Sequence, residues 1–167
     1  IGPSNIISNH PNIKQINVTS ADEMYTEVDK VFCDSDISVF SAAVSDYKPK
    51  KVYSEKKKKI EKNWSISLEK NRDILFDMST KKTNKQFIVG FALETENGEK
   101  NAINKLKNKN LDLIILNSTK DKGATFSYDT NKISIIDKDL NINKYSLKLK
   151  KEVAKDIIKY IIKKLKN

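Results

Sequence analysis

Short apolar runs alternate with amphipathic stretches in the first part of this 167-residue chain. An alternating run occupies residues 13–18, and Ser20 and Glu23 then stand at the spacing of a capping box, which marks a helix start. We expect a helix over residues 21–32 to follow. Its buried stripe is predicted from the apolar residues at helical spacing, which are Met24, Val28, Val31 and Phe32. Residues 36–43 have little polarity on either face, as is typical of a strand covered by helices on both sides, so the order predicts a strand–helix–strand unit.

The same alternation continues to the end of the chain. Residues 44–63 are polar and include Pro49, which predicts a loop. The later pattern predicts strands at 64–68, 86–92 and 111–116, helices at 72–79 and 99–106, and two further strands at 132–136 and 143–149, beside turn residues at 129–131 and 137–139. Residues 151–166 carry one broad apolar face, which favours a helix packed on the domain over one lying on a membrane or a partner. We therefore expect an α/β fold, a single three-layer Rossmann-like domain over residues 1–167 with a mainly parallel sheet and later antiparallel strands.

The composition argues against several classes of protein. A chain with 38% hydrophobic residues can bury a core, unlike a disordered protein. It contains no apolar run close to the roughly 20 residues that span a bilayer and no signal-peptide pattern, so we expect a soluble cytoplasmic protein without a membrane partner. Cys33 is the single cysteine and His10 the single histidine, so neither a disulfide nor a zinc site is expected. The chain begins at Ile1, and we expect it to be part of a longer protein.

The net charge of +10 raises the question of nucleic-acid binding. Of the 32 basic residues, however, only Arg72 is an arginine, the residue type that most often reads base edges and clamps phosphates. The many lysines occur beside many asparagines, which indicates a general compositional bias with lysines on the solvated surface. We therefore expect no nucleic-acid partner.

A candidate anion site follows the strand predicted at residues 36–43. The small residues Ser41, Ala42 and Ala43 let a ligand approach the main chain, and ligands of such folds bind beyond the carboxyl ends of strands. Asp46 then stands where a carboxylate can bond ribose hydroxyls or a hydrated Mg²⁺, although a solvated loop aspartate fits equally well. The adjacent lysines at residues 56–59 suit a triphosphate, or else form a solvated run in a lysine-rich protein.

Two later segments complete the set of candidates. Gly90 permits close main-chain approach near a strand end, and the neighbouring Phe91 either stacks on a base or belongs to the core. Lys105 and Lys109 are four residues apart on one helical face, a pairing that is also common on ordinary surface helices. The common phosphate-loop, dinucleotide, zinc-protease and serine-hydrolase motifs are all missing from the sequence, so phosphate binding would need a less common arrangement.

Taken in order, these segments resemble the synthetase domain of bacterial phosphopantothenoylcysteine synthetase, usually fused to a flavin-dependent decarboxylase in coenzyme A biosynthesis. The resemblance is collinear over nearly the whole chain. In the first half of the chain, Gly2-Pro3 resembles the family's SGP motif, residues 41–49 resemble AAVADYRP, residues 56–59 resemble KIKK, and residues 70–75 resemble KNPDIL. In the second half, residues 89–95 resemble VGFAAET, Lys105 and Lys109 match KxxxK, and residues 110–114 match the strand that follows it. Phe126, Asp129 and Asn131 resemble the family's GFxxDxN turn. The chain departs from the family pattern at four places. Ser45 stands where the family has Ala, Lys57 where it has Ile, Arg72 where it has Pro, and residues 116–118 where it has AND. The family's first strand, glycine-containing phosphate loop and an active-site asparagine would lie upstream of Ile1.

The resemblance implies a ligase that joins 4'-phosphopantothenate to L-cysteine through an acyl-cytidylate made from CTP. The implied CTP-binding residues are Phe40, Ser41, Ala42, Asp46, Lys56, Arg72, Asp73, Ile74, Leu75, Phe91, Lys105 and Lys109. Lys56 is the implied catalytic residue, and Lys57, Lys58 and Lys59 would form a basic lid. The resemblance further implies Mg²⁺ with unassigned ligands, a homodimer, and FMN only if a decarboxylase domain precedes this chain. Whether this chain alone is active stays open, as does the alternative of another α/β nucleotide-binding enzyme or a non-catalytic nucleotide-binding domain.

Overall fold

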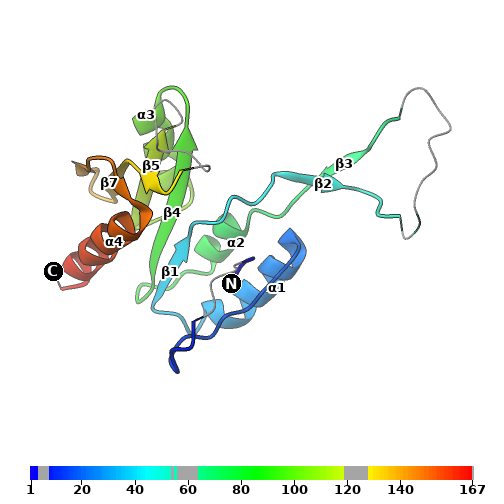
Figure 1. Cartoon of the computed structure of the whole chain (residues 1–167), viewed down its shortest axis with the longest axis horizontal. Coiled ribbons are helices and arrows are strands. Elements are labelled where there is room, and N and C mark those ends of the chain that lie inside the picture. Colours follow the sequence, from blue (N-terminus) through cyan, green and yellow to red (C-terminus); the bar gives the residue numbers. More distant parts are fainter. Residues whose placement is uncertain (4–7, 54, 56–63, 119–127, 167) are drawn as a thin grey trace. The chain divides into compact units, whose positions relative to one another are not determined.

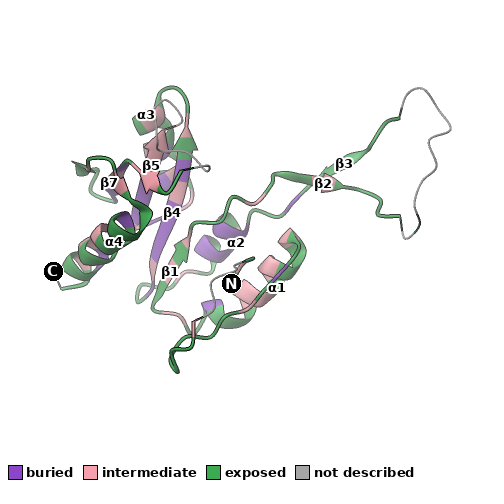
Figure 2. Cartoon of the chain, viewed as in Figure 1, coloured by how far each residue is buried: buried purple, intermediate pink, exposed green. Residues whose placement is uncertain are grey.

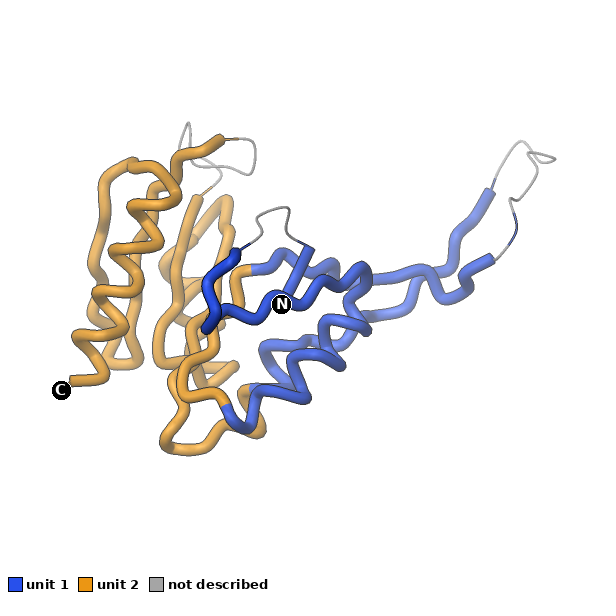
Figure 3. Tube along the Cα trace, turned by 60° about the horizontal axis from the view of Figure 1, so that its bottom comes forward, with its two compact units in different colours: residues 1–34, 42–78 blue, residues 35–41, 79–167 orange. Residues whose placement is uncertain are grey.

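The computed structural model describes residues 1–3, 8–53, 55, 64–118 and 128–166. The chain divides into two compact units, coloured separately in Figure 3. Unit 1 contains residues 1–34 and 42–78, and unit 2 contains residues 35–41 and 79–167. The single domain expected over residues 1–167 stays a prediction, and each unit is described by itself below.

A five-stranded sheet forms the centre of unit 2 (Figure 1). Its strands, in spatial order, are β1 (Ile37–Phe40), β4 (Phe87–Glu94), β5 (Leu113–Ser118), β7 (Ile133–Asp137) and β8 (Ile142–Lys144). β1, β4 and β5 run parallel, whereas β7 and β8 are antiparallel to their neighbours. The predicted α/β fold, with parallel strands followed by antiparallel ones, is confirmed.

Two helices cover opposite faces of this sheet. α4 (Lys150–Leu165) buries Val153, Ile157 and Ile161 on the face that carries Val89, Leu113 and Ile115 (Figure 2). α3 (Gly98–Asn108) lies on the other face, where a Cβ added to Gly98 would stand 3.5 Å from a methyl of Leu116. Burying a large aliphatic side chain contributes about 1.5–3 kcal/mol, so the core on the two faces is the main source of stability for unit 2.

The remaining strands of unit 2 are short. β6 (Thr130–Asn131) pairs antiparallel with β9 (Lys148–Leu149), next to the start of α4. The turn residues predicted at 129–131 therefore include a strand, while those at 137–139 do join β7 to β8. None of the described helices is long and apolar enough to cross a membrane.

Asp112 fixes the start of β5 against β4. The Asp112 main-chain N donates to the Ile88 carbonyl, 3.0 Å away, and one Asp112 carboxylate oxygen accepts from the Ile88 main-chain N at 2.7 Å. The same oxygen lies 2.6 Å from Nζ of Lys82. The Asp112 side chain thus extends the pairing of β4 with β5 by one residue before its first pair, Val89 with Leu113.

Two expectations about burial in unit 2 are wrong. Ile37 and Val39 of β1 are 42% and 50% exposed, although both faces of this strand were predicted to be covered. β1 is the end strand of the described sheet, and the part of the face that α4 covers does not reach it. Ile158, Ile162 and Leu165 are also exposed, because the apolar face of α4 is wider than its contact with the sheet.

Unit 1 contains the helix that the sequence predicts most directly. α1 (Ala21–Phe32) begins with the expected capping box, in which Ser20 Oγ accepts from the Glu23 main-chain N and Glu23 accepts from the Ser20 main-chain N. The Thr19 main-chain N donates to the same carboxylate at 2.7 Å, and this bond is the main reason that the pKa of Glu23 is lowered. Of the predicted stripe only Phe32 is fully buried, since Met24 and Val28 are half-buried and Val31 is exposed.

The other elements of unit 1 are α2 (Ile74–Thr80), whose last residues belong to unit 2, and the antiparallel pair of β2 (Tyr47–Pro49) and β3 (Leu68–Lys70). Residues 44–63 were predicted as loop and 64–68 as strand, and both expectations need correction. Pairing of Tyr47 with Lys70 makes residues 47–49 a strand and moves its partner toward the C-terminus. This register depends on residues far apart in sequence, which a local pattern does not reveal.

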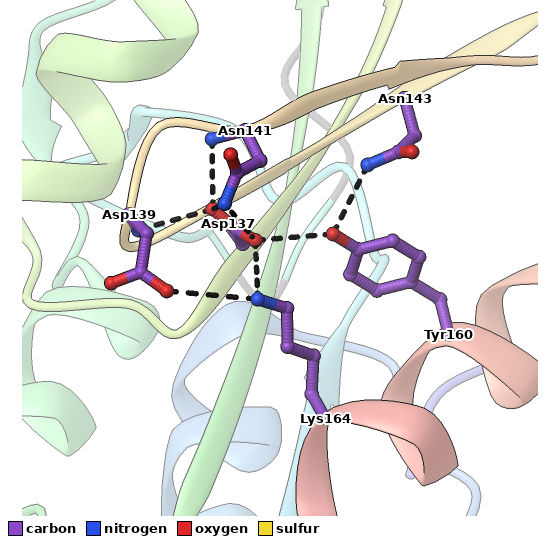
Figure 4. A network of polar contacts seen from close by, with 6 residues as sticks. All are labelled: Asp137, Asp139, Asn141, Asn143, Tyr160 and Lys164. Atoms are coloured by element: carbon purple, nitrogen blue, oxygen red, sulfur yellow. Dashed lines mark hydrogen bonds and ion pairs between the residues drawn. The ribbon is translucent and has the colours of Figure 1, made fainter. Parts of the chain in front are cut away.

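A buried carboxylate ties α4 to the turn between β7 and β8 (Figure 4). Asp137 is 1% exposed and accepts hydrogen bonds from Lys164 Nζ at 2.6 Å, the Asn141 main-chain N at 2.9 Å and the Tyr160 hydroxyl at 3.1 Å. Burial alone would raise the pKa of Asp137, but the bonds from Lys164, Asn141 and Tyr160 outweigh it and lower the pKa to about 2. The network is therefore a charged clamp between the C-terminal helix and the sheet.

We expect Asp137→Asn to destabilise the protein by about 3 kcal/mol near neutral pH, because it leaves Lys164 without its buried counter-charge. The folded pKa of about 2 lies below the unfolded value of about 3.9, so this stability is present above about pH 4 and is lost as the pH falls through about 2. Urea denaturation measures both effects. Asp139→Asn is the matched control, since this carboxylate is exposed and 3.6 Å from Lys164, and we expect it to change stability by about 0.5 kcal/mol or less. Equal losses in the two variants would contradict the assignment.

Candidate functional site

The residues proposed for ligand binding divide between the two units. Unit 2 contains Phe40, Ser41, Phe91, Lys105 and Lys109, and unit 1 contains Ala42, Asp46 and residues 72–75. Lys56, Lys57, Lys58 and Lys59 lie outside the described residues, as does Phe126. The geometry of the two groups is therefore given separately, and their meeting in one site stays a prediction.

In unit 2, the parallel pairing places the end of β1 beside the middle of β4, which continues to Glu94. Phe40 is in register with Gly90, and Ser41 follows directly after β1. Both strands point toward the edge of the sheet where such folds bind ligands, and β1 stops four residues before β4 does. Phe91 is half-buried and packs against the apolar cluster beneath α4. This packing supports the core alternative for Phe91, and its stacking on a base stays a prediction.

Lys105 is bound to the sheet itself. Its Nζ donates to the main-chain carbonyl of Phe91, 2.9 Å away, so α3 is fastened to the middle of β4 by a charged donor. Lys109 is the C-cap residue of α3, and its main-chain N donates to the Lys105 carbonyl. Lys105 therefore lies on the helix and Lys109 directly after it, so their position on one helical face stays a prediction. The anchoring of Lys105 is not visible in the sequence.

In unit 1, the segment that contains Asp46 is held by Asn71. The Asn71 main-chain N donates to the Asp46 carbonyl and its Nδ2 donates to the Ser45 carbonyl, each at 2.8 Å. Asn71 lies immediately after β3 and is 7% exposed, while the Asp46 side chain is exposed to solvent. Sequence reasoning singled out Asp46 but gave Asn71 no role. The one available signal was its place in the KNRDIL segment, since the pairing of β2 with β3 is not visible in sequence.

Residues 72–75 have separate structural roles at the start of α2. Asp73 Oδ1 accepts from the Phe76 main-chain N at 3.0 Å, which is the geometry of a helix cap. The side chains of Ile74 and Leu75 are buried, so only their main chain is available to a ligand. The Arg72 guanidinium lies 4.6 Å from the centre of the Tyr25 ring, a cation–π contact with α1.

Lys48, the middle residue of β2, lies between two carboxylates of unit 1. Its ammonium pairs with Asp22 of α1 and lies 3.8 Å from Glu69, its neighbour across the strands. The hydrogen bond with Asp22 is the main reason that the pKa of Lys48 is raised. Two positive side chains of unit 1 therefore contact α1: Lys48 pairs with Asp22, and Arg72 lies over the Tyr25 ring.

The described residues contain no group of three or more His, Cys, Asp or Glu side chains placed to hold a metal ion. Asp46 offers a single exposed carboxylate. This suits a hydrated Mg²⁺ that is held mainly by the phosphates of a nucleotide, because such ions commonly take only one or two protein carboxylates.

These features define an α/β protein with a Rossmann-like sheet and a candidate ligand site at the carboxyl ends of its parallel strands. Residues 1–165 match the family described as the DNA/pantothenate metabolism flavoprotein C-terminal domain, and the chain belongs to this family. The resemblance to coenzyme A biosynthesis proteins is thereby confirmed at the level of the family.

Curated relatives match nearly the whole chain. The chain is 39% identical to the coenzyme A biosynthesis bifunctional protein CoaBC of Haemophilus influenzae, over 98% of this chain and 40% of that protein. It is 43% identical to a protein named cysteine/cysteine sulfinic acid decarboxylase from an unknown prokaryotic organism, over 97% of this chain and 45% of that protein. The chain thus spans less than half the length of these relatives.

Solved structures share the fold. The crystal structure of the C-terminal domain of CoaBC is similar with a TM-score of 0.78 and 32% identity, covering 99% of this chain and 72% of that one. A Cab2 variant in complex with phosphopantothenate-cysteine has a TM-score of 0.59 at 16% identity, covering 78% of this chain and 46% of that one, which shows similarity of fold alone.

Proposed function

We propose that this chain carries the CTP-dependent ligase site that joins 4'-phosphopantothenate to L-cysteine. The observation that carries the proposal is the segment after β1, where small residues lead to the exposed Asp46 and Asn71 holds the main chain of Ser45 and Asp46. Membership of the pantothenate-metabolism family and the relationship to CoaBC support it. The name of the decarboxylase relative belongs to a protein more than twice as long, so it gives no activity to this chain.

The reaction needs two displacements. A carboxylate is a poor acyl electrophile, so one carboxylate oxygen of 4'-phosphopantothenate attacks the α-phosphorus of CTP, and pyrophosphate leaves. The amine of cysteine then attacks the acyl carbon of the resulting acyl-cytidylate, the amine loses a proton, and CMP leaves with the former carboxylate oxygen. Catalysis of this kind depends on positioning the two substrates and stabilising charge that develops on phosphate oxygens.

The proposed roles of the residues follow from this chemistry. The main chain at Phe40, Ser41 and Ala42 approaches the nucleotide, and Asp46 bonds the ribose or a hydrated Mg²⁺ whose charge offsets that of the triphosphate. Lys56 stabilises the charge on the reacting phosphate. The remaining proposed contacts are the main chain of residues 72–75, Phe91, Lys105 and Lys109, with Lys57, Lys58 and Lys59 as a basic lid. FMN would bind only if a decarboxylase domain precedes this chain in the full-length protein.

We further propose that the protein acts as a homodimer joined through the β2–β3 pair. Large apolar side chains are exposed on these strands and just beyond them, namely Tyr47, Val52, Tyr53, Trp64, Ile66 and Leu68. A concentration of exposed apolar side chains is typical of a protein interface. A second copy of the chain offers the same apolar surface, and a two-fold arrangement would bury both.

Pyrophosphate release by the full-length protein tests the ligase proposal. We expect release from CTP, but not from ATP, that requires 4'-phosphopantothenate, with phosphopantothenoylcysteine formed once cysteine is added. Asp46→Ala and Lys56→Ala should each lower kcat/KM by about 100-fold or more, since they remove charge-stabilising or nucleotide-binding groups. Asp139→Ala and Lys85→Ala are controls at exposed positions and should leave the rate within about 2-fold of wild type. A full-length protein with no substrate-dependent release would overturn the proposal.

Light scattering after size-exclusion chromatography tests the dimer. Trp64→Glu should convert the dimer to a monomer, because a buried unpaired charge at an interface is strongly unfavourable. Ile158→Glu in α4 is the matched control, since Ile158 is 56% exposed and Trp64 61%. A wild-type monomer, or equal effects of both substitutions, would contradict an interface on the β2–β3 pair.

A further inference from the structure

Asn71 is placed to control the main chain on which Asp46 stands. The β2–β3 ladder ends with the pairing of Tyr47 and Lys70, and the bond from the Asn71 main-chain N to the Asp46 carbonyl extends it by one residue. The Asn71 carboxamide then adds a bond to Ser45, which the ladder alone would not make. The two carbonyls that flank the Asp46 Cα, those of Ser45 and Asp46, are thereby held by one residue.

The Asp46 carboxylate has no such support of its own. Among the described residues, no hydrogen bond or ion pair involves this side chain, and it is exposed. An aspartate side chain has only two rotatable bonds, so the position of its carboxylate follows closely from the position of its main chain. Whatever fixes the main chain at residues 45–46 therefore also sets where the carboxylate can reach.

Asn71 occupies this position at a cost. The residue is more than nine-tenths buried, and its Oδ1 has no hydrogen-bond partner among the described residues. A buried carbonyl oxygen without a donor is unfavourable, and such groups in native proteins call for an explanation. The donor function of Nδ2 supplies one, because an apolar residue would leave Ser45 unheld and an aspartate would place a negative oxygen against the Ser45 carbonyl.

We propose that Asn71 is a positioning residue of the ligase site, acting through Asp46. The carboxamide holds the Ser45–Asp46 main chain so that the Asp46 carboxylate is already in place when the nucleotide binds. This inference rests on the proposed function, because it assigns Asn71 a role in CTP use in addition to its role in holding the fold of unit 1. Preorganisation of this kind lowers the cost of binding without any contact between Asn71 and the nucleotide.

A double-mutant cycle in the full-length protein tests this role. We expect Asn71→Ala and Asn71→Asp each to lower kcat/KM for CTP by about 10-fold, chiefly through a higher KM, because each removes the donor to Ser45. In an Asp46→Asn background the same substitutions should change kcat/KM by less than about 2-fold, because the carboxylate that they position is already lost. Asn84→Ala, at an exposed asparagine in the turn before β4, is the control and should leave both backgrounds unchanged.

The outcomes separate the two proposals. Losses of equal size in the wild-type and Asp46→Asn backgrounds would show a purely structural role for Asn71 and overturn this inference alone. Wild-type kinetics in a folded Asn71→Asp protein would overturn it as well, and this variant keeps the test decisive if Asn71→Ala fails to fold. A wild-type protein that releases no pyrophosphate from CTP would overturn the proposed function together with the role of Asn71 in it.

Discussion

The parallel alignment of β1, β4 and β5 is the constraint on which the rest of the structure depends. The Phe87 main-chain N donates to the Asp36 carbonyl at 2.8 Å to begin one pairing, and Asp112 begins the next through its main chain and its carboxylate. Parallel strands all point toward the same edge, so the segments that follow β1 and β4 leave the sheet on the same side, that after β1 beside Gly90. The apolar layers beneath α3 and α4 hold this alignment, and the Asp137 clamp fastens α4 to the sheet.

The proposed function follows from what the chain does after it leaves that edge. Ser41 and Ala42 have small side chains, and a few residues later Asn71 holds the main chain of Ser45 and Asp46 by two hydrogen bonds. The sheet determines where this segment begins, and the β2–β3 pair determines where it stops. Within unit 1, the β2–β3 pair and Asn71 hold the main chain of Asp46, and support of a loop side chain by a rigid scaffold is common in binding sites.

Local patterns predicted the parts of the fold that depend on local interactions. The capping box at Ser20 and Glu23 predicts the start of α1, because its hydrogen bonds join residues three apart. The pairing of Tyr47 with Lys70 joins residues far apart, so the local pattern predicts a loop where β2 forms and indicates no role for Asn71. The contact of Lys105 with the Phe91 carbonyl and the exposure of Ile158 likewise depend on how far a helix overlaps the sheet. The residue pattern alone predicts Ser41, Ala42, Asp46, Phe91, Lys105 and Lys109 among the candidates, the family resemblance supplies their roles and further residues, and their meeting in one site remains a prediction.

The most direct test of the central claim follows an oxygen atom through the reaction. 4'-Phosphopantothenate with isotopically labelled carboxylate oxygens is turned over by the full-length protein with CTP and cysteine, and the CMP is analysed by mass spectrometry. Attack of the carboxylate on the α-phosphorus predicts that each CMP carries one labelled oxygen, because that oxygen remains on phosphorus when the amide forms. Unlabelled CMP, or product formed without CMP, would contradict an acyl-cytidylate and with it the assignment of this chain as a CTP-dependent ligase.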